Sequence, residues 1–270
     1  MDIKTIVRIA APAALAATLV FGQAKQPQPK SQKEAEAIQA IFQAQDPDAR
    51  IAAAEALLQK FADTEFKAIA LQVAAMSAQQ KNDFEKMVIY AERTLEADPK
   101  NYTAMLMLAS GLAQRTREFD LDKEEKLARA EKYANSAMEL IKTSTKPRPD
   151  LPDEQWEAAK KDFTAQAYES LGLTAMVRKK YDVAVTNFKS ATETGAQPDP
   201  ATMVRLASAY NHLGKPDEAI AVLDKLNTLP EVNPQIKQVA QAERNNAVKI
   251  KSGAKPATTP TAPPQVEIKK

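Results

Sequence analysis

Residues that could do chemistry are few in this chain of 270 residues. It has one histidine, His212, and no cysteine. A histidine-centred triad, a multi-histidine metal site, a thiolate metal site and a cysteine nucleophile therefore all lack their parts. His212 lies two residues after Tyr210, at the end of an expected helix. This position favours a surface or capping role over a ligand contact. The sequence shows no phosphate-cradling glycine loop and no nucleophile motif, so we expect no enzyme and no cofactor.

One acidic segment has some of the residue types of a metal site. Asp120-x-Asp122-x-Glu124-Glu125 is faintly similar to a calcium loop, but the glycine of the sharp turn and the remaining spacing are missing. We expect instead that Asp122 caps a helix and that Glu125 is its capping-box partner. The sequence predicts no metal site.

The composition favours helix throughout. There are only 6 glycines, and aromatic residues make up 6% of the chain. Long stretches are rich in Ala, Leu, Glu, Lys and Gln, which are good helix formers. No run of alternating β-branched residues indicates a strand. The formal net charge of +2 gives no general attraction to nucleic acid. We therefore expect an all-α protein that does not bind nucleic acid.

The N-terminus is typical of a secretory signal peptide. Lys4 and Arg8 precede an apolar run over residues 9–21, and Gly22-Gln23-Ala24 supplies a small-x-small cleavage site. The run is broken by Pro12 and is shorter than the roughly 20 residues that span a bilayer. Residues 1–24 are thus predicted to be removed near Ala24, and an uncleaved anchor is the alternative. The mature protein is expected to be periplasmic or extracellular, with no integral membrane span.

Helix start signals and prolines divide the mature chain. Residues 25–30 form a short linker, residues 31–251 a helical repeat domain with a terminal capping helix, and residues 252–270 a disordered Pro/Thr-rich tail. Ser31-x-x-Glu34 reads as a capping box. Asp46-Pro47, Asp199-Pro200 and Asn233-Pro234 each offer an N-cap followed by a proline in the first turn. Two insertions interrupt the pattern, at Arg115–Lys126 and Thr143–Pro152.

A helical hairpin repeats itself between Tyr168 and Leu226. From Gly172 to Ala207 is 35 residues, and from Ala184 to Ala219 is again 35. Two landmarks that shift by one period indicate a stacked repeat, in which each unit buries its apolar face on a neighbour. Such a stack makes a binding surface rather than a reaction centre.

The repeat resembles the tetratricopeptide repeat, whose pattern is W-x2-L-G-x2-Y, then A-x3-F, then P, over about 34 residues. In the fourth hairpin Tyr168 takes the place of the tryptophan and Ala175 that of the tyrosine. The remaining positions are filled by Leu171-Gly172, Ala184 and Phe188. In the fifth hairpin the matching residues are Met203, Leu206-Ala207, Tyr210, Ala219 and Leu223. The resemblance covers roughly residues 31–247, although no repeat has the tryptophan. It implies an α-solenoid, a right-handed superhelix of about five antiparallel helix hairpins.

Small residues mark the close approaches inside the hairpins. Gly172, Ala109 and Ala207 lie where the first and second helices of a hairpin must come close. We expect Gly172→Leu to destabilise the fold by overpacking.

In this family the first helices of successive hairpins line a concave groove, and the resemblance therefore implies a groove here. We predict that it binds a peptide or helix of a protein partner through amide, Met and Leu side chains. The residues projected onto it are Gln72, Met76, Gln79, Leu106, Ser110, Gln114, Glu169, Leu173, Met176, Arg205, Ser208 and Asn211. The expected function is a non-catalytic interaction module of the cell envelope or periplasm.

Two alternatives stay open. In the first, the chain is a structural envelope component that docks through its tail and its two insertions. In the second, it is an enzyme with carboxylates in an unrecognised cleft.

Overall fold

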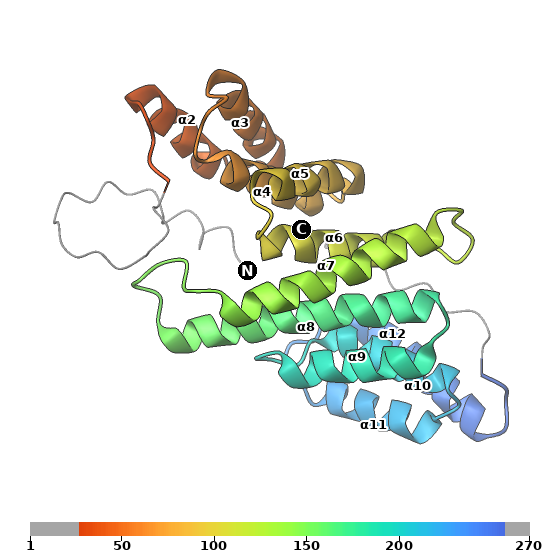
Figure 1. The fold of residues 1–270 in the computed structure, drawn as a ribbon. Coiled ribbons are helices and arrows are strands. Elements are labelled where there is room, and N and C mark those ends of the chain that lie inside the picture. Colours follow the sequence, from red (N-terminus) through yellow and green to blue (C-terminus); the bar gives the residue numbers. More distant parts are fainter. Residues whose placement is uncertain (1–26, 257–270) are drawn as a thin grey trace. The chain divides into compact units, whose positions relative to one another are not determined.

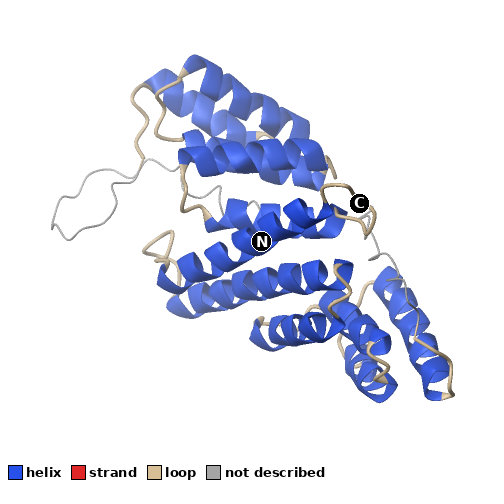
Figure 2. Ribbon diagram, turned by 45° about the vertical axis from the view of Figure 1, so that its right-hand side comes forward, coloured by secondary structure: helices blue, strands red, loops and turns tan. Residues whose placement is uncertain are grey.

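The structure is a computed structural model that describes residues 27–256. The predicted signal peptide and residues 257–270 of the predicted tail lie outside the described residues. The described part is built of helices joined by loops, with no strand in residues 27–256 (Figure 1, Figure 2). Its helices are α2 (Gln32–Gln43), α3 (Pro47–Lys60), α4 (Lys67–Gln80), α5 (Phe84–Ala97), α6 (Tyr102–Arg115), α7 (Lys123–Thr143), α8 (Asp153–Val177), α9 (Tyr181–Thr194), α10 (Pro200–His212), α11 (Pro216–Asn227) and α12 (Pro234–Lys251).

The helices form two compact units, with the division between Ala104 and Met105. In unit 1, α2 packs on α3, α3 on α4, and α4 on α5. In unit 2, each helix from α7 to α11 packs on the next, and α12 covers both α10 and α11. Within the series α2 to α5 and the series α7 to α12, helices that follow one another in sequence are thus neighbours in space. This confirms the predicted all-α, tetratricopeptide-like stack of hairpins.

Side-chain caps start several of the helices where the sequence predicts. The carboxylates of Asp46 and Asp199 accept from backbone N–H groups of α3 and α10, each of which has proline in its first turn. Asn233 caps α12 in the same way. Ser31 accepts from the backbone N–H of Glu34 at 3.1 Å. The Glu34 carboxylate accepts from the backbone of Lys30 at 2.6 Å, one residue before the position that a capping box would use.

The predicted cap of α7 is wrong. Asp122 stands at the N-cap position but makes no side-chain hydrogen bond to the first turn. Its carboxylate pairs with Lys126 Nζ at 2.9 Å instead. A lysine one turn into the helix thus competes successfully for the capping carboxylate.

Three of the hairpins turn through the same backbone geometry. The second residue after the first helix has positive φ at Asn82 (58°), Lys179 (59°) and Gly214 (66°). In each case the next residue donates its N–H to a carbonyl of the last helical turn, as at Lys180 to Ala175 (2.9 Å). This is a Schellman end, which satisfies carbonyls that the helix leaves open. Each of these turns has three residues: 81–83, 178–180 and 213–215.

The close approach predicted at Gly172 is present. A Cβ atom added there would lie 2.5 Å from two ring carbons of Phe188, which is fully buried on α9. Since real Cβ contacts are essentially never so short, only glycine fits against this ring as it lies. One repeat later, Ala207 and Leu223 lie together in the core cluster of unit 2, which also contains Ala219 and Leu226.

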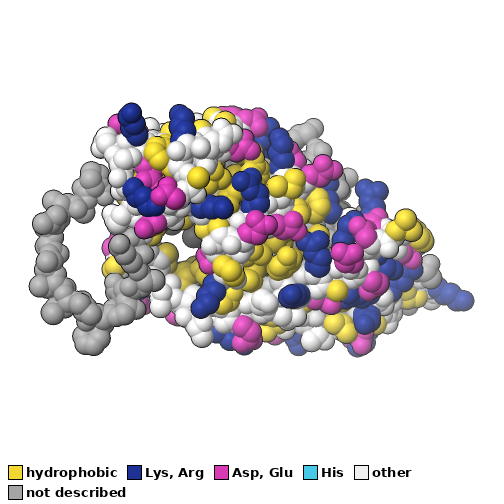
Figure 3. Space-filling model, turned by 45° about the horizontal axis from the view of Figure 1, so that its top comes forward, with side chains coloured by type: hydrophobic (Ala, Val, Ile, Leu, Met, Phe, Trp, Pro, Cys, Tyr) yellow, Lys and Arg dark blue, Asp and Glu magenta, His cyan; other side chains and the backbone are white. Residues whose placement is uncertain are grey.

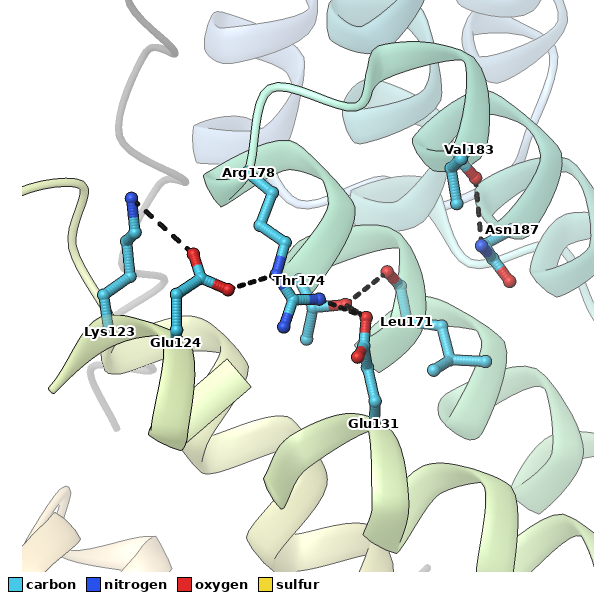
Figure 4. A network of polar contacts seen from close by, with 8 residues as sticks. All are labelled: Lys123, Glu124, Glu131, Leu171, Thr174, Arg178, Val183 and Asn187. Carbon is cyan, nitrogen blue, oxygen red and sulfur yellow. Dashed lines mark hydrogen bonds and ion pairs between the residues drawn. The ribbon is translucent and has the colours of Figure 1, made fainter. Parts of the chain in front are cut away.

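Polar contacts fix α8 against α7 (Figure 4). Arg178, at the C-terminal end of α8, donates from Nε to Glu124 at 2.8 Å and from Nη1 to Glu131. The Arg178 side chain is 14% exposed, whereas that of Glu124 is 64% exposed. The hydrogen bond from Arg178 lowers the pKa of Glu124. Since α8 supplies a wall of the site described next, this network helps to position that site.

Candidate partner-binding site

Five of the twelve residues predicted for the groove are buried. They are Leu106, Ser110, Leu173, Ser208 and Asn211, with exposures of 8% or less. Asn211 is tied to α12, since its amide donates to the Glu243 backbone at 3.0 Å and to the Glu243 carboxylate at 2.8 Å. These five side chains serve packing in this structure rather than an open surface.

The seven other predicted residues keep some exposure. Gln72 accepts from the Asn101 amide at 2.9 Å, and Gln114 donates to Ser110 at 2.8 Å on its own helix. Gln79 and Gln114 are exposed, and Met76 and Met176 are half-buried. Glu169 and Arg205 are the pair from different helices that the structure joins directly. The groove as a set therefore stays a prediction, with these seven residues as its accessible members.

Glu169 and Arg205 form an ion pair between α8 and α10, the first helices of the fourth and fifth hairpins. Both side chains are largely covered, with 20% and 14% of their surface exposed. Burial raises the pKa of Glu169, and the Arg205 charge opposes that rise. Arg205 Nε is buried with no hydrogen-bond partner, so the guanidinium does not use its full donor set here.

A hollow of about 380 Å³ opens beside this pair. Residues of four consecutive segments line it: α8, the end of α9, the connection 195–199, and the start of α10. They are Asp162, Ala165, Gln166, Glu169, Ala191, Gly195, Gln197, Pro198, Asp199, Pro200 and Thr202. The hollow thus lies between two first helices, where the groove was predicted, but only Glu169 of the predicted residues lines it.

Local sequence explains why the hollow has this form. Asp199 accepts from the backbone and hydroxyl of Thr202 at 2.7 and 2.8 Å, which starts α10. Asp162 accepts from the backbone of Ala196 at 2.8 Å and so ties the connection 195–199 to α8. At Gly195 an added Cβ would lie 3.1 Å from the Gln197 carbonyl, so a larger residue would crowd this connection. The Asp199-Pro200 signal was visible in the sequence, whereas the bond from Ala196 to Asp162 had no sequence signature.

The residues that could do other chemistry are engaged in structural contacts. His212 is half-buried and its ring stacks on that of Tyr181, with centroids 4.5 Å apart and planes 7° from parallel. Asp120 and Asp122 pair with Lys126, and Glu124 pairs with Arg178. Across residues 27–256, no group of His, Cys, Asp or Glu side chains could hold a metal ion.

Charge is mixed over the face drawn in Figure 3. In Figure 3, basic and acidic side chains are interspersed over the visible face without a large area of one sign. Among the described helices, none combines the length and the apolar character needed to cross a membrane.

Comparison with known proteins agrees with the helical hairpins. A tetratricopeptide repeat family model matches residues 200–233, which contain α10 and α11. A thermophilic TPR protein from Thermus thermophilus is similar in structure, with a TM-score of 0.52 and 16% identity over 73% of this chain and 90% of that one. A tetratricopeptide repeat protein from Parabacteroides merdae gives a TM-score of 0.41 at 16% identity, over 82% of this chain and 93% of that one. No curated protein sequence matches the chain.

The evidence for the family thus comes from three directions. The landmarks of the fourth and fifth hairpins recur after 35 residues. The family model matches the second of these hairpins, and the Thermus thermophilus structure shares the fold. Residues 200–233 match the tetratricopeptide repeat, and the described helices have a fold similar to that of a tetratricopeptide-repeat protein.

Proposed function

We propose that this chain is a non-catalytic interaction module of the cell envelope or periplasm, and that it binds a peptide or helix of a partner protein between its first helices. Tetratricopeptide repeats suggest protein–protein interaction in general. The hollow between α8 and α10 is the observation that carries the finer proposal, because it is an accessible concave surface on two successive first helices.

The lining of the hollow suits a polypeptide ligand. Gln166, Gln197 and Thr202 offer amide and hydroxyl groups of the kind that bind a peptide backbone. Asp162, Glu169 and Asp199 contribute three carboxylates, against the single guanidinium of the adjacent Arg205. A partner segment that presents basic or amide groups fits this balance better than an acidic segment.

The proposed location rests on the sequence of residues 1–24. A basic start, a 13-residue apolar run and a small-x-small site together are typical of an exported protein. Cell fractionation, with mass spectrometry of the mature N-terminus, tests this proposal. An N-terminus near residue 25 in an envelope or extracellular fraction supports export, and an intact Met1 in the cytoplasm contradicts it.

The binding proposal calls for variants that leave the fold intact. Substituting the buried Leu106 or Leu173 would disturb packing, so these positions cannot test a surface. Gln166 is half-buried and Gln197 is exposed, and both line the hollow. Gln166→Arg with Gln197→Arg adds bulk and two positive charges there. The matched control is Gln80→Arg with Gln238→Arg, at two exposed positions outside the hollow.

The experiment is affinity capture from envelope extract with the wild-type chain and both variants. A protein captured by the wild type and the control, but lost by the hollow variant, supports the proposal. Equal capture by all three moves the binding site elsewhere on the chain.

The structural-component alternative stays open through the tail and the insertions. Deleting residues 252–270 separates the two ideas, since a partner lost by this deletion favours the tail. Retained binding favours the hollow.

A further inference from the structure

The described part of the tail runs back to the body of unit 2. Gly253 ends α12 in a Schellman end, with a φ of 103°. Pro256 is half-buried and reaches the turn between α10 and α11, where its Cγ atom would lie 3.7 Å from a Cβ atom added to Gly214. Residues 257–270 therefore continue from the C-terminal end of α10.

The hollow at the other end of α10 carries negative charge that its own contacts do not offset. The exposed carboxylates of Asp162 and Asp199 accept from backbone N–H and hydroxyl groups, which are neutral. Among the ion pairs of the described residues, only that of Glu169 with Arg205 involves a carboxylate that lines the hollow. Three carboxylates against one guanidinium leave a net negative charge.

The carboxylates of the hollow are close enough to affect one another. Burial raises the pKa of Glu169, while the charge of Arg205 opposes this rise and the charge of Asp199 adds to it. Because a like charge nearby disfavours the ionised form, a cation placed in the hollow would stabilise the ionised carboxylates together.

The sequence that follows Pro256 combines a tether with a basic segment. Residues 257–264 read Ala-Thr-Thr-Pro-Thr-Ala-Pro-Pro, and Pro-rich sequences of this kind act as extended spacers. Residues 265–270, the basic segment, read Gln-Val-Glu-Ile-Lys-Lys, with two lysines against one glutamate. The basic segment thus offers the cationic and amide groups that the hollow favours.

The tether has the length that the hollow requires. From Gly214 to the start of α10 is roughly 20 Å along the helix, at about 1.5 Å per residue. The 13 residues 257–269 span about 20 Å on average as a flexible chain and about 40 Å as a polyproline II helix. A tether whose average length matches the span gives its ligand a millimolar effective concentration.

We propose that the basic segment is an internal ligand of the hollow, with Lys269 and Lys270 placed against its carboxylates. The proposal rests on the binding surface proposed above and adds its regulation, since a partner must displace the basic segment before it binds. The reach of the tether from Pro256 and the charge of the hollow are two separate observations that support it.

The test uses a single spin label on the full chain. Because the sequence has no cysteine, Gln265→Cys provides a unique attachment site for a nitroxide. Broadening of backbone amide NMR signals then reports which residues the label approaches.

Variants of the labelled chain remove the contact from either side. Each is first shown to melt as the labelled chain does. The tail variant is Lys269→Glu with Lys270→Glu, the hollow variant is Gln166→Arg with Gln197→Arg, and the matched control at exposed positions is Lys33→Glu with Lys132→Glu.

We expect the label to broaden the amide signals of residues 162–169 and 195–202. At a millimolar effective concentration, even a site of millimolar affinity is occupied at least about half of the time. Both charge variants and added salt should remove the broadening, and the control should keep it. Unaffected signals of the hollow overturn the proposal, as does broadening that the charge variants retain or that grows with protein concentration.

This readout needs no partner protein, so it is separate from the capture experiment. A chain without the broadening, whose hollow variant still loses a captured protein, would refute the internal ligand and leave the proposed function standing. The tail variant should bind a protein captured through the hollow at least about twofold more tightly than the wild type, because its hollow is free. Equal or weaker binding would overturn the regulation.

Discussion

The fourth and fifth hairpins place side chains of different size at the same two facing positions. In the fourth hairpin Gly172 meets the ring of Phe188, and 35 residues later Ala207 and Leu223 share the core of unit 2. Gly172, the smallest residue, is matched with the large Phe188, whereas the slightly larger Ala207 is matched with the smaller Leu223. The repeat thus keeps the combined volume of the pair rather than the identity of either residue.

The two hairpins also differ in how their first helices end. Arg178, the C-cap residue of α8, binds two carboxylates of α7, whereas the C-cap residue of α10, 35 positions later, is the half-buried Leu213. At the next position Lys179 takes the positive φ that Gly214 takes in the fifth hairpin. The fourth hairpin therefore departs from the fifth at four matched positions, each of which can be tested by exchange.

The largest expected effect is at the tightest contact. Gly172→Leu should lower the free energy of unfolding by about 3 kcal/mol, since even a Cβ atom lies within 2.5 Å of the Phe188 ring. Urea unfolding measures it. A midpoint unchanged from the wild type would show that the helices are not in contact there.

Copying the fifth hairpin into the fourth should restore part of the loss. Gly172→Ala and Phe188→Leu are each expected to destabilise by about 1–2 kcal/mol, the first by crowding and the second by leaving a void. The double variant, which reproduces the Ala207 and Leu223 pair, should lose at least about 1 kcal/mol less than the sum. If the loss of the double variant equals the sum of the two single losses in the same urea experiment, the two positions do not compensate for each other's volume.

Removing the arginine at the end of α8 should have a smaller effect. Arg178→Leu, which copies Leu213, is expected to cost about 1 kcal/mol because Glu131 loses its hydrogen bond. The wild type should also be more sensitive to acid than the variant. The hydrogen bond from Arg178 holds the pKa of Glu124 below its ordinary value of 4.5. The ion pair therefore contributes fully to stability above pH 4.5, and this contribution is lost as the pH falls through the lowered pKa.

Thermal melts between neutral pH and the acid range below the ordinary pKa of glutamate check this prediction. The gap in melting temperature between wild type and Arg178→Leu should narrow on acidification. A difference in melting temperature that widens on acidification would contradict a stabilising ion pair between Arg178 and Glu124.

The smallest effects concern the hairpin turns, and here the two hairpins should respond with opposite sign. Gly214→Ala is expected to lose about 1 kcal/mol, because a Cβ is strained at a φ of 66°. Lys179→Gly should gain a few tenths of a kcal/mol, since relief of the same strain outweighs the exposed pair with Glu118. Calorimetric melting of both variants decides it, and a loss at both positions would refute the equivalence of the turns.

Much of the fold could be predicted because its signals are local. Asp199-Pro200 and Asn233-Pro234 start helices through bonds within one turn, and the 35-residue period locates Gly172 against the second helix of its hairpin. Asp122 failed as a cap because Lys126 competes for its carboxylate, a choice between two local partners that the sequence leaves open.

The candidate site could be predicted only in outline. A helical period places Leu173 and Asn211 on the first helices but does not say that packing covers them, as α12 does for Asn211. The hollow depends on the hydrogen bond from the Ala196 backbone to Asp162, which is 34 residues away in sequence. No local sequence pattern predicts such a bond. The positive φ at Lys179 was likewise hidden, because lysine is not a turn signal.

The most direct test of the proposed function is one capture experiment from envelope extract. Its three arms are the wild type, Gln166→Arg with Gln197→Arg in the hollow, and the control Gln80→Arg with Gln238→Arg. We predict a protein that the wild type and the control capture and that the hollow variant fails to capture. Equal capture of every protein by the wild type and the hollow variant would contradict a partner site between α8 and α10.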